Sequence, residues 1–254
     1  MKKVLLIGIG AGNPDYVTMQ AVKALNATDV FFFLDKGDAK KDLGDLRRTV
    51  CEQFIEDKSY RIVEVPGPVR DMGAPDYKSG VHAWHRDKAQ IFSSLIADEL
   101  KDGEVGAFLV WGDPSLYDST LRVIEQILEE GALSFEYEII PGITSVQALA
   151  AEHKIALNPI GEPVHITTGR RLVEGLPHSV DTAVVMLDNG AGLRALIDED
   201  VEIFWGAYLG TPDQVLISGK LKECVSAIEE ARAAERARKG WIMDTYLLRR
   251  AAKA

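Results

Sequence analysis

Residues 4–14, with the sequence VLLIGIGAGNP, set the pattern that the first half of the chain follows. Val4–Ile9 is an almost continuous apolar run, which is typical of a strand covered on both faces in a parallel sheet. Gly10, Gly12 and Pro14 then end the run, and an amphipathic helix is expected over Thr18–Leu25. The stretch therefore predicts the first strand, loop and helix of an α/β sheet.

The same alternation of apolar strand and amphipathic helix continues to residue 151. Further strands are expected at 30–34, 61–65, 105–110 and 135–140, and helices at 42–55, 76–100, 121–128 and 144–151. This repetition predicts a mainly parallel sheet with helices on both of its faces.

The pattern changes at residues 157–163, where Pro159, Gly161 and Pro163 form a turn-rich segment. Beyond it, strands are expected at 164–168, 182–187, 201–206, 214–218 and 241–248, with helices only at 192–197 and 220–239. We therefore predict two α/β domains, residues 1–158 and 159–254, the second with a mixed sheet. A ligand cleft is expected between them, because small ligands commonly bind at domain interfaces.

Composition argues against several classes of partner. The 254 residues carry 29 basic and 39 acidic side chains, a formal net charge of −10, whereas proteins that bind duplex nucleic acid normally show a basic excess. Every apolar run is far shorter than the roughly 20 residues needed to span a bilayer. Cys51 and Cys224 lie far apart, which favours a reducing compartment with both packed as small apolar groups. We expect a soluble, cytoplasmic protein without nucleic-acid or membrane partners.

The glycine loop at residues 8–12 admits two interpretations. A dinucleotide-binding fingerprint needs G-x-G-x-x-G opening directly into a helix, whose N-terminal amides hold a pyrophosphate. Here the spacing is G-x-G-x-G, and Pro14 removes an amide donor and disfavours helical geometry at Asn13. Asp35 nevertheless lies about where a ribose-binding acid would stand. An NAD(P)-dependent oxidoreductase that uses Gly8–Gly12 therefore stays an alternative.

Two more loops follow predicted strands. Trp111–Tyr117, with the sequence WGDPSLY, follows the strand at 105–110, and Ile140–Ser145, with the sequence IPGITS, ends the strand at 135–140. Taken singly, such segments are ordinary turn chemistry. Three of them at the carboxyl edge of one parallel sheet predict a ligand site, because ligands of open α/β sheets bind at that edge.

In order and spacing, the motifs at 8–15, 112–114 and 141–145 resemble those of the tetrapyrrole (corrin/porphyrin) methyltransferase family, the class III methyltransferases. Gly210–Gln214 and Ser218–Leu221 are similar to the family's C-terminal motif, so the resemblance covers almost the whole chain. It implies two α/β domains, an S-adenosylmethionine site in their cleft, S-adenosylhomocysteine as product and a homodimer. The cofactor-binding residues that it implies are Ala11, Trp111, Gly112, Asp113, Leu116, Thr144, Ser145, Leu187, Tyr208 and Leu209.

Three further stretches, 35–48, 76–85 and 240–248, resemble the branch of this family that also removes an acetyl group. The implied function is methylation of precorrin-5 at C-1 with release of acetate, giving precorrin-6A. Two alternatives to this function are another tetrapyrrole methyltransferase of the same family and a tetrapyrrole carrier with a degenerate donor site. The glycine loop departs from the commoner family form G-A-G-P-G-D, with Ala11 for proline and Asn13 for aspartate, and Trp111 stands where many members have glycine.

A tetrapyrrole substrate carries several carboxylates, which basic side chains bind through charge-assisted hydrogen bonds. Basic candidates are expected on the exposed side of the helix at 42–55 and in a loop after the strand at 164–168: Lys40, Lys41, Arg47, Arg48, Arg170 and Arg171. For any one of them a solvated surface position is the simpler interpretation. We favour Arg170 and Arg171, because a loop after a strand can point into the cleft.

Deacetylation calls for acid–base groups, and the candidates are His82, His85, Asp113, Tyr117 and Asp118. The two histidines fall, with Lys78, on one face of the helix at 76–100, and histidine transfers protons near neutral pH. Asp113 is expected to meet the amino-acid portion of the methyl donor or, alternatively, only to cap the following helix. The histidines lack a third ligand at helical spacing, so a metal is not expected.

Overall fold

The computed structural model describes residues 1–35, 41–68, 77–177 and 179–250, and only the backbone of 41–43, 77–79 and 81. The described chain forms two compact units, Met1–Ile143 and Thr144–Ala254. The division falls before the helix α5 (Ser145–His153), because α5 packs on strands of the second unit. The turn-rich segment 157–163, where the sequence places the division, lies inside that unit.

The first unit is a parallel five-stranded sheet in the order β3-β2-β4-β1-β5. Its strands are β1 (Lys3–Gly8), β2 (Val30–Asp35), β3 (Arg61–Pro66), β4 (Val105–Val110) and β5 (Glu136–Ile140). Its helices are η1 (Pro14–Tyr16, a 3-10 helix), α1 (Met19–Asn26), α2 (Lys41–Phe54), α3 (Tyr77–Glu99) and α4 (Thr120–Glu130). The predicted parallel sheet is confirmed.

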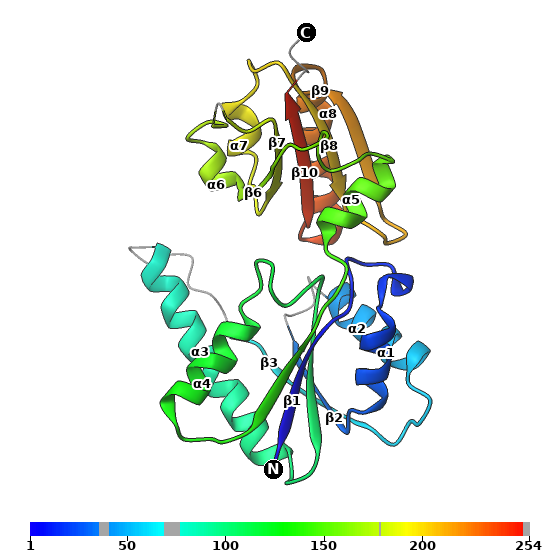
Figure 1. The fold of residues 1–254 in the computed structure, drawn as a ribbon, viewed down its shortest axis with the longest axis vertical. Coiled ribbons are helices and arrows are strands. Elements are labelled where there is room, and N and C mark those ends of the chain that lie inside the picture. Colours follow the sequence, from blue (N-terminus) through cyan, green and yellow to red (C-terminus); the bar gives the residue numbers. More distant parts are fainter. Residues whose placement is uncertain (36–40, 69–76, 178, 251–254) are drawn as a thin grey trace. The chain divides into compact units, whose positions relative to one another are not determined.

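Strand β1 shows why an apolar run predicts this arrangement. Val4 and Leu6 belong to the core formed with α3 and α4, whereas Leu5 and Ile7 belong to the core formed with α1 and α2. Successive side chains of a strand point to opposite faces, so a strand covered on both faces is apolar throughout. Figure 1 shows the two pairs of helices on opposite sides of the sheet.

The second unit is a mixed sheet in the order β6-β7-β10-β8-β9, in which only β6 and β7 are parallel neighbours. Its strands are β6 (Val164–Thr168), β7 (Thr182–Met186), β8 (Val201–Ala207), β9 (Val215–Lys220) and β10 (Asp244–Arg250). Besides α5, its helices are α6 (Gly169–Leu172), α7 (Ala191–Ala195) and α8 (Leu221–Lys239). Trp205 and Tyr246 are the largest side chains of its core. The predicted mixed sheet is confirmed.

Two further features bear on the sequence predictions. Cys51 is buried in the first unit, and burial raises the pKa of its thiol to about 12, as expected of a cysteine packed as a small apolar group. Cys224 is partly buried, and burial raises its pKa as well. Among the helices of the described residues, none has the length and apolarity to cross a membrane.

Candidate active site

The loops singled out in the sequence lie at one edge of the first sheet. The chain leaves β1 through α1 on one face and leaves β4, its neighbour, through α4 on the other face. Such a reversal is a topological switch point, and ligands of open α/β sheets bind at the carboxyl ends of the strands there. β5 is the other neighbour of β1, so the loops after β1, β4 and β5 are adjacent.

These three loops are in direct backbone contact. Gly10 and Gly112 exchange hydrogen bonds, with N···O distances of 3.3 Å and 2.7 Å. A Cβ atom added to Gly142 would lie 2.1 Å from the carbonyl oxygen of Gly112, and one added to Gly8 would lie 2.6 Å from the amide nitrogen of Gly142. Glycine is needed at these two positions because the neighbouring backbone leaves no room for a side chain.

Asp113 joins two of the loops through its side chain. Its Oδ2 accepts a hydrogen bond of 2.8 Å from the amide of Gly142, and its Oδ1 accepts from the amide of Ser115, also at 2.8 Å, and from the Ser115 hydroxyl. Asp113 does not cap the following helix, since α4 begins at Thr120 and the Asp118 carboxylate accepts the Thr120 amide at 2.6 Å. The helix-capping interpretation of Asp113 is therefore wrong.

The pKa of Asp113 lies below its ordinary value. Burial raises it, but hydrogen bonds from the Ser115 hydroxyl and from the amides of Gly142 and Ser115 together lower it by more. Asp113 is therefore a carboxylate at neutral pH. Its contribution to stability is fully present above the ordinary range of an aspartate and is lost as the pH falls through the lowered value.

The other predicted residues of this edge differ in exposure. Ala11 is buried, whereas Trp111 and Leu116 are partly buried. Tyr117 is 44% exposed, and burial of the rest of its side chain raises the pKa of its hydroxyl. The hydroxyl therefore stays protonated at neutral pH and can donate a hydrogen bond.

The second unit contains the remaining residues that the family resemblance assigns to donor binding. Thr144 is the N-cap of α5 and forms a capping box with Gln147. Its hydroxyl accepts a hydrogen bond from the amide of Val146, and the side chain of Gln147 accepts one from the amide of Thr144, both at 3.1 Å. Ser145 is the first residue of that helix. Leu187 directly follows β7 and Tyr208 directly follows β8. Leu209, the next residue along, is buried.

Three predicted site residues have left-handed backbone geometry. Tyr117, Leu187 and Tyr208 have φ angles of 52°, 54° and 49°, and Lys154 is the one other non-glycine residue of the described chain with a positive φ. Such geometry costs roughly 1–3 kcal/mol for a residue with a side chain and tends to cluster at functional sites. The strain thus falls on loops for which the family resemblance predicts contacts with the donor.

A buried polar network holds the loop that follows Leu187. The carboxylate of Asp188 accepts hydrogen bonds from the amides of Gly190 and Gly192, both at 3.1 Å, and from the hydroxyl of Tyr246 at 2.8 Å. Arg232 of α8 donates to the Asp188 carbonyl at 2.9 Å. The loop is therefore fixed from three elements: its own helix α7, strand β10 and helix α8.

Asp244 completes this network. Its Oδ2 accepts from Nε of Arg232 at 2.6 Å and from the indole of Trp205 at 2.7 Å. Burial and the neighbouring Asp188 raise the pKa of Tyr246, so its hydroxyl stays a donor. This network could not be predicted from the sequence, because its members are widely separated along the chain.

The predicted basic residues do not form one cluster. Arg47 was expected on an exposed helix face, and this is wrong: it is partly buried, and its Nε donates to the carbonyl of Leu109, at the end of β4, at 3.0 Å. Burial lowers the pKa of Arg47, and the Asp118 carboxylate opposes this. Arg48 is paired with Glu64. Lys40 and the side chain of Lys41 lie outside the described residues.

Arg170 and Arg171 lie in the short helix α6, where the sequence predicted a loop. Both side chains are exposed, and Arg171 pairs with Glu174 at 3.2 Å. Four residues are too few to give an amphipathic pattern, which is why the helix was missed.

The two histidines of α3 also remain surface groups. His82 is exposed, and His85 is partly buried beside Trp84, with 5.4 Å between the ring centroids. In the part of the chain that the structure describes, no group of three or more His, Cys, Asp or Glu side chains could hold a metal ion. The side chain of Lys78 lies outside the described residues.

Lys88 is a charged residue of this edge that the sequence interpretation missed. It lies on α3, only 8% exposed, and its ammonium donates to the hydroxyls of Ser119 and Thr120 at 2.8 Å and 3.3 Å. Its position could have been noticed, because it lies one helical turn from both Trp84 and Phe92, two large aromatic side chains of the same expected helix.

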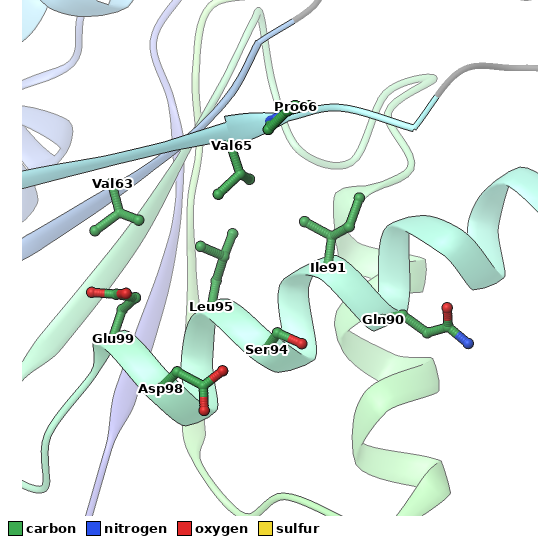
Figure 2. A pocket seen from close by; sticks show the side chains of 9 residues that line it. All are labelled: Val63, Val65, Pro66, Gln90, Ile91, Ser94, Leu95, Asp98 and Glu99. Atoms are coloured by element: carbon green, nitrogen blue, oxygen red, sulfur yellow. The ribbon is translucent and has the colours of Figure 1, made fainter.

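A cavity of about 450 Å³ lies elsewhere in the first unit, between β3 and α3. Figure 2 shows Val65 and Leu95 pointing toward each other across it, with Asp98 and Glu99 at the end of the helix. None of the residues that line it comes from the three glycine-containing loops. It is therefore separate from the candidate site.

The loop geometry argues against the dinucleotide alternative. After the glycine loop the chain forms η1, with Pro14 as its first residue and Asn13 as its N-cap, and α1 starts only at Met19. A pyrophosphate site needs the helix N-terminus directly after the glycines. That arrangement is absent from residues 8–19, which the structure describes throughout.

The comparisons with known proteins assign the class. Residues 3–225 match the sequence profile of the tetrapyrrole (corrin/porphyrin) methylases, and the chain belongs to this family. Within it, the chain is 50% identical over 252 residues to precorrin-6A synthase (deacetylating) of Sinorhizobium sp, covering 99% of this chain and 97% of that relative.

Solved structures agree with this assignment. The crystal structure of a cobalamin synthesis related protein, CobF, from Corynebacterium diphtheriae is 39% identical, with a TM-score of 0.83 and 98% of each chain covered. A uroporphyrin-III C-methyltransferase from Thermus thermophilus, complexed with S-adenosylhomocysteine, has a TM-score of 0.56 at 18% identity, covering 97% of this chain and 96% of that one. The second likeness shows the shared fold.

Proposed function

We propose that this protein is an S-adenosylmethionine-dependent C-methyltransferase that converts precorrin-5 to precorrin-6A, with methylation at C-1 and release of acetate. The observation that carries the proposal is the 50% identity to precorrin-6A synthase (deacetylating) along nearly the full length of both chains. The two-domain α/β fold and the ordered loops at the edge of the first sheet support it.

The carboxylate of Asp113 suits the cationic amino-acid portion of the methyl donor. Asp113 is ionised, and the amino-acid portion of the donor carries an ammonium group, which can donate a charge-assisted hydrogen bond to a carboxylate. Backbone groups near Ala11, Gly112, Thr144 and Leu187 would supply most of the remaining contacts. The donor provides an electrophilic methyl group on a sulfonium, and the protein contributes alignment, which can lower a barrier by about 7–11 kcal/mol in ideal cases.

The decisive test is turnover of precorrin-5 with S-adenosylmethionine, followed by mass spectrometry. Gain of one methyl group together with loss of a two-carbon unit, recovered as acetate, is the expected result. Methylation without that loss would assign the protein to another reaction of the same family. Binding without any methyl transfer in a single turnover would instead support a carrier.

Donor binding can be tested by calorimetry with S-adenosylhomocysteine and, in parallel, with NADH. We expect the first to bind and the second not to bind; the reverse would reject the proposed function. A homodimer and a cytoplasmic location belong to the same proposal, and light scattering of the purified protein tests the first of them.

Replacing Asp113 with alanine is expected to weaken S-adenosylhomocysteine binding about tenfold or more. The change removes the carboxylate that we propose to accept a hydrogen bond from the ammonium group of the donor, and a hydrogen bond to a charged group contributes about 1.5–3 kcal/mol. Asp102→Ala, an exposed aspartate in a turn of the same unit, is the matched control and should bind as the wild type does. Equal affinity for all three proteins would remove Asp113 from the donor site.

Arg170→Ala and Arg171→Ala are each expected to raise the Michaelis constant for the tetrapyrrole severalfold, with little change in donor affinity. A guanidinium that binds one of several substrate carboxylates contributes to substrate affinity and leaves the methyl donor unaffected. Arg236→Ala, an exposed arginine on α8, controls for loss of surface charge in the same unit. Equal Michaelis constants in all four proteins would place both arginines outside the substrate site.

A further inference from the structure

Lys88 is buried at an electrostatically unfavourable position. Its ammonium lies beside the N-terminus of α4, through its bonds to Ser119 and Thr120, and the rings of Trp84 and Phe92 lie 5.4 Å and 5.1 Å from it. A helix N-terminus carries partial positive charge, so it repels a cation. The aromatic rings offset part of this repulsion by attracting the cation.

The surrounding charges add to the cost. The pKa of Lys88 lies below its ordinary value. Burial is the main cause and the guanidinium of Arg47 adds to it, while the carboxylate of Asp118 opposes them. Burial of a charged group is unfavourable unless its partners compensate fully. An apolar side chain of similar length would fit the same surroundings of Trp84 and Phe92 without this cost. Side chains whose placement lowers stability commonly serve function.

Lys88 takes the place of the usual capping interaction at the start of α4. Ser119 is the N-cap of this helix, yet its hydroxyl makes no capping hydrogen bond and accepts the Lys88 ammonium instead. Asp118 supplies the missing acceptor through its 2.6 Å bond from the Thr120 amide. The residue before it, Tyr117, has the left-handed φ of 52°. One ammonium thus fixes Ser119 and Thr120 and attracts Asp118, directly after the donor loop.

We propose that Lys88 is a positioning residue of the methyl-transfer site, which holds Tyr117 and Asp118 in the arrangement that the tetrapyrrole substrate meets. This inference rests on the proposed function for its kinetic consequence, and on the hydrogen bonds to Ser119 and Thr120 for its structural one. Lys88 acts through its neighbours, and no covalent step is assigned to it.

The test compares Lys88→Met with Arg86→Met, which removes a positive charge from an exposed position on the same helix. We expect Lys88→Met to unfold at the same or a higher denaturant concentration than the wild type. Its kcat/KM for the tetrapyrrole should fall about tenfold or more, with S-adenosylhomocysteine affinity within threefold of the wild type. Arg86→Met should match the wild type in all three measurements.

Hydrogen exchange provides a readout that does not need the substrate. In Lys88→Met the amides of residues 117–120 should exchange at least severalfold faster, while the core of the sheet stays protected. Unchanged exchange in this segment would overturn the inference, whether or not precorrin-5 is turned over. Equal loss of stability and activity, restored together at lower temperature, would also overturn it, since Lys88 would then support only the fold.

A second variant, Ser119→Ala, removes the main acceptor of Lys88 and leaves every charge in place. We expect it to lower kcat/KM for the tetrapyrrole by a smaller factor than Lys88→Met does, and to speed hydrogen exchange at the amide of Thr120. A wild-type protein that fails to methylate any tetrapyrrole would reject the proposed function, while the exchange experiment would still decide the role of Lys88.

Discussion

Replacing Gly142 with alanine is expected to destabilise the first unit by about 3 kcal/mol and to abolish donor binding. The added methyl group would lie 2.1 Å from the carbonyl oxygen of Gly112 and 2.8 Å from the carbonyl carbon of Gly8. Both neighbours are backbone atoms of strand ends or loops, so neither can rotate away as a side chain would. Overpacking of this kind costs about 1–3 kcal/mol and occasionally more.

Urea unfolding and calorimetry with S-adenosylhomocysteine measure the two effects. Gly44→Ala is the matched control, because a Cβ atom at Gly44 meets nothing within 4 Å and the residue lies inside α2. Alanine in a helix interior is favoured over glycine by roughly 0.5–1 kcal/mol, so the control should be slightly more stable than the wild type. An unfolding midpoint of Gly142→Ala equal to that of the wild type would mean that the three loops have room to separate.

Replacing Arg232 with methionine is expected to destabilise the second unit by about 3–5 kcal/mol. Methionine fills much of the same volume but leaves Asp188 and Asp244 without the cation that both contact. Removal of one partner from a buried charge network is costly because the remaining charge stays uncompensated. We also expect weaker donor binding, since Asp188 is the residue after Leu187.

The double variant Arg232→Met, Asp244→Asn should recover part of the lost stability, because it removes one of the two unpaired carboxylates. Arg238→Met on the same helix is the control. Its partners, Asp213 and Glu235, are near the surface and its own side chain is 49% exposed, so the expected loss is below about 1 kcal/mol. Equal stability of Arg232→Met and Arg238→Met would show that the network does not stabilise the unit.

The first sheet could be predicted from sequence because burial on both faces leaves a simple signature. Val4 and Leu5 enter different cores, so apolarity without alternation was the correct signal for β1. The boundary of the units could not be found in this way. Thr144 is joined to the first unit by a short Pro-Gly segment, and a turn of that kind gives the same signal as the turns inside a domain.

The candidate site was predictable in its loops and less so in its contacts. Glycines at positions 8, 112 and 142 suggested turns, whereas the structure shows that two of them allow close backbone approach. The sequence singles out Asp113, but the hydrogen bond from Gly142 to Asp113 joins residues that are 29 positions apart. Pairings of this kind depend on the strand order, and strand order is not encoded in local periodicity.

The left-handed backbone at Tyr117, Leu187 and Tyr208 has a consequence for anyone who redesigns this protein. Glycine would relieve strain at each of them, so a procedure that ranks substitutions by folding energy alone would favour it there. Tyr117 is a predicted acid–base group, and Leu187 and Tyr208 are residues for which the family resemblance predicts contacts with the methyl donor. A thermostable variant obtained by such relief would be expected to lose catalysis as it gains robustness, and these three residues are the ones to leave unaltered.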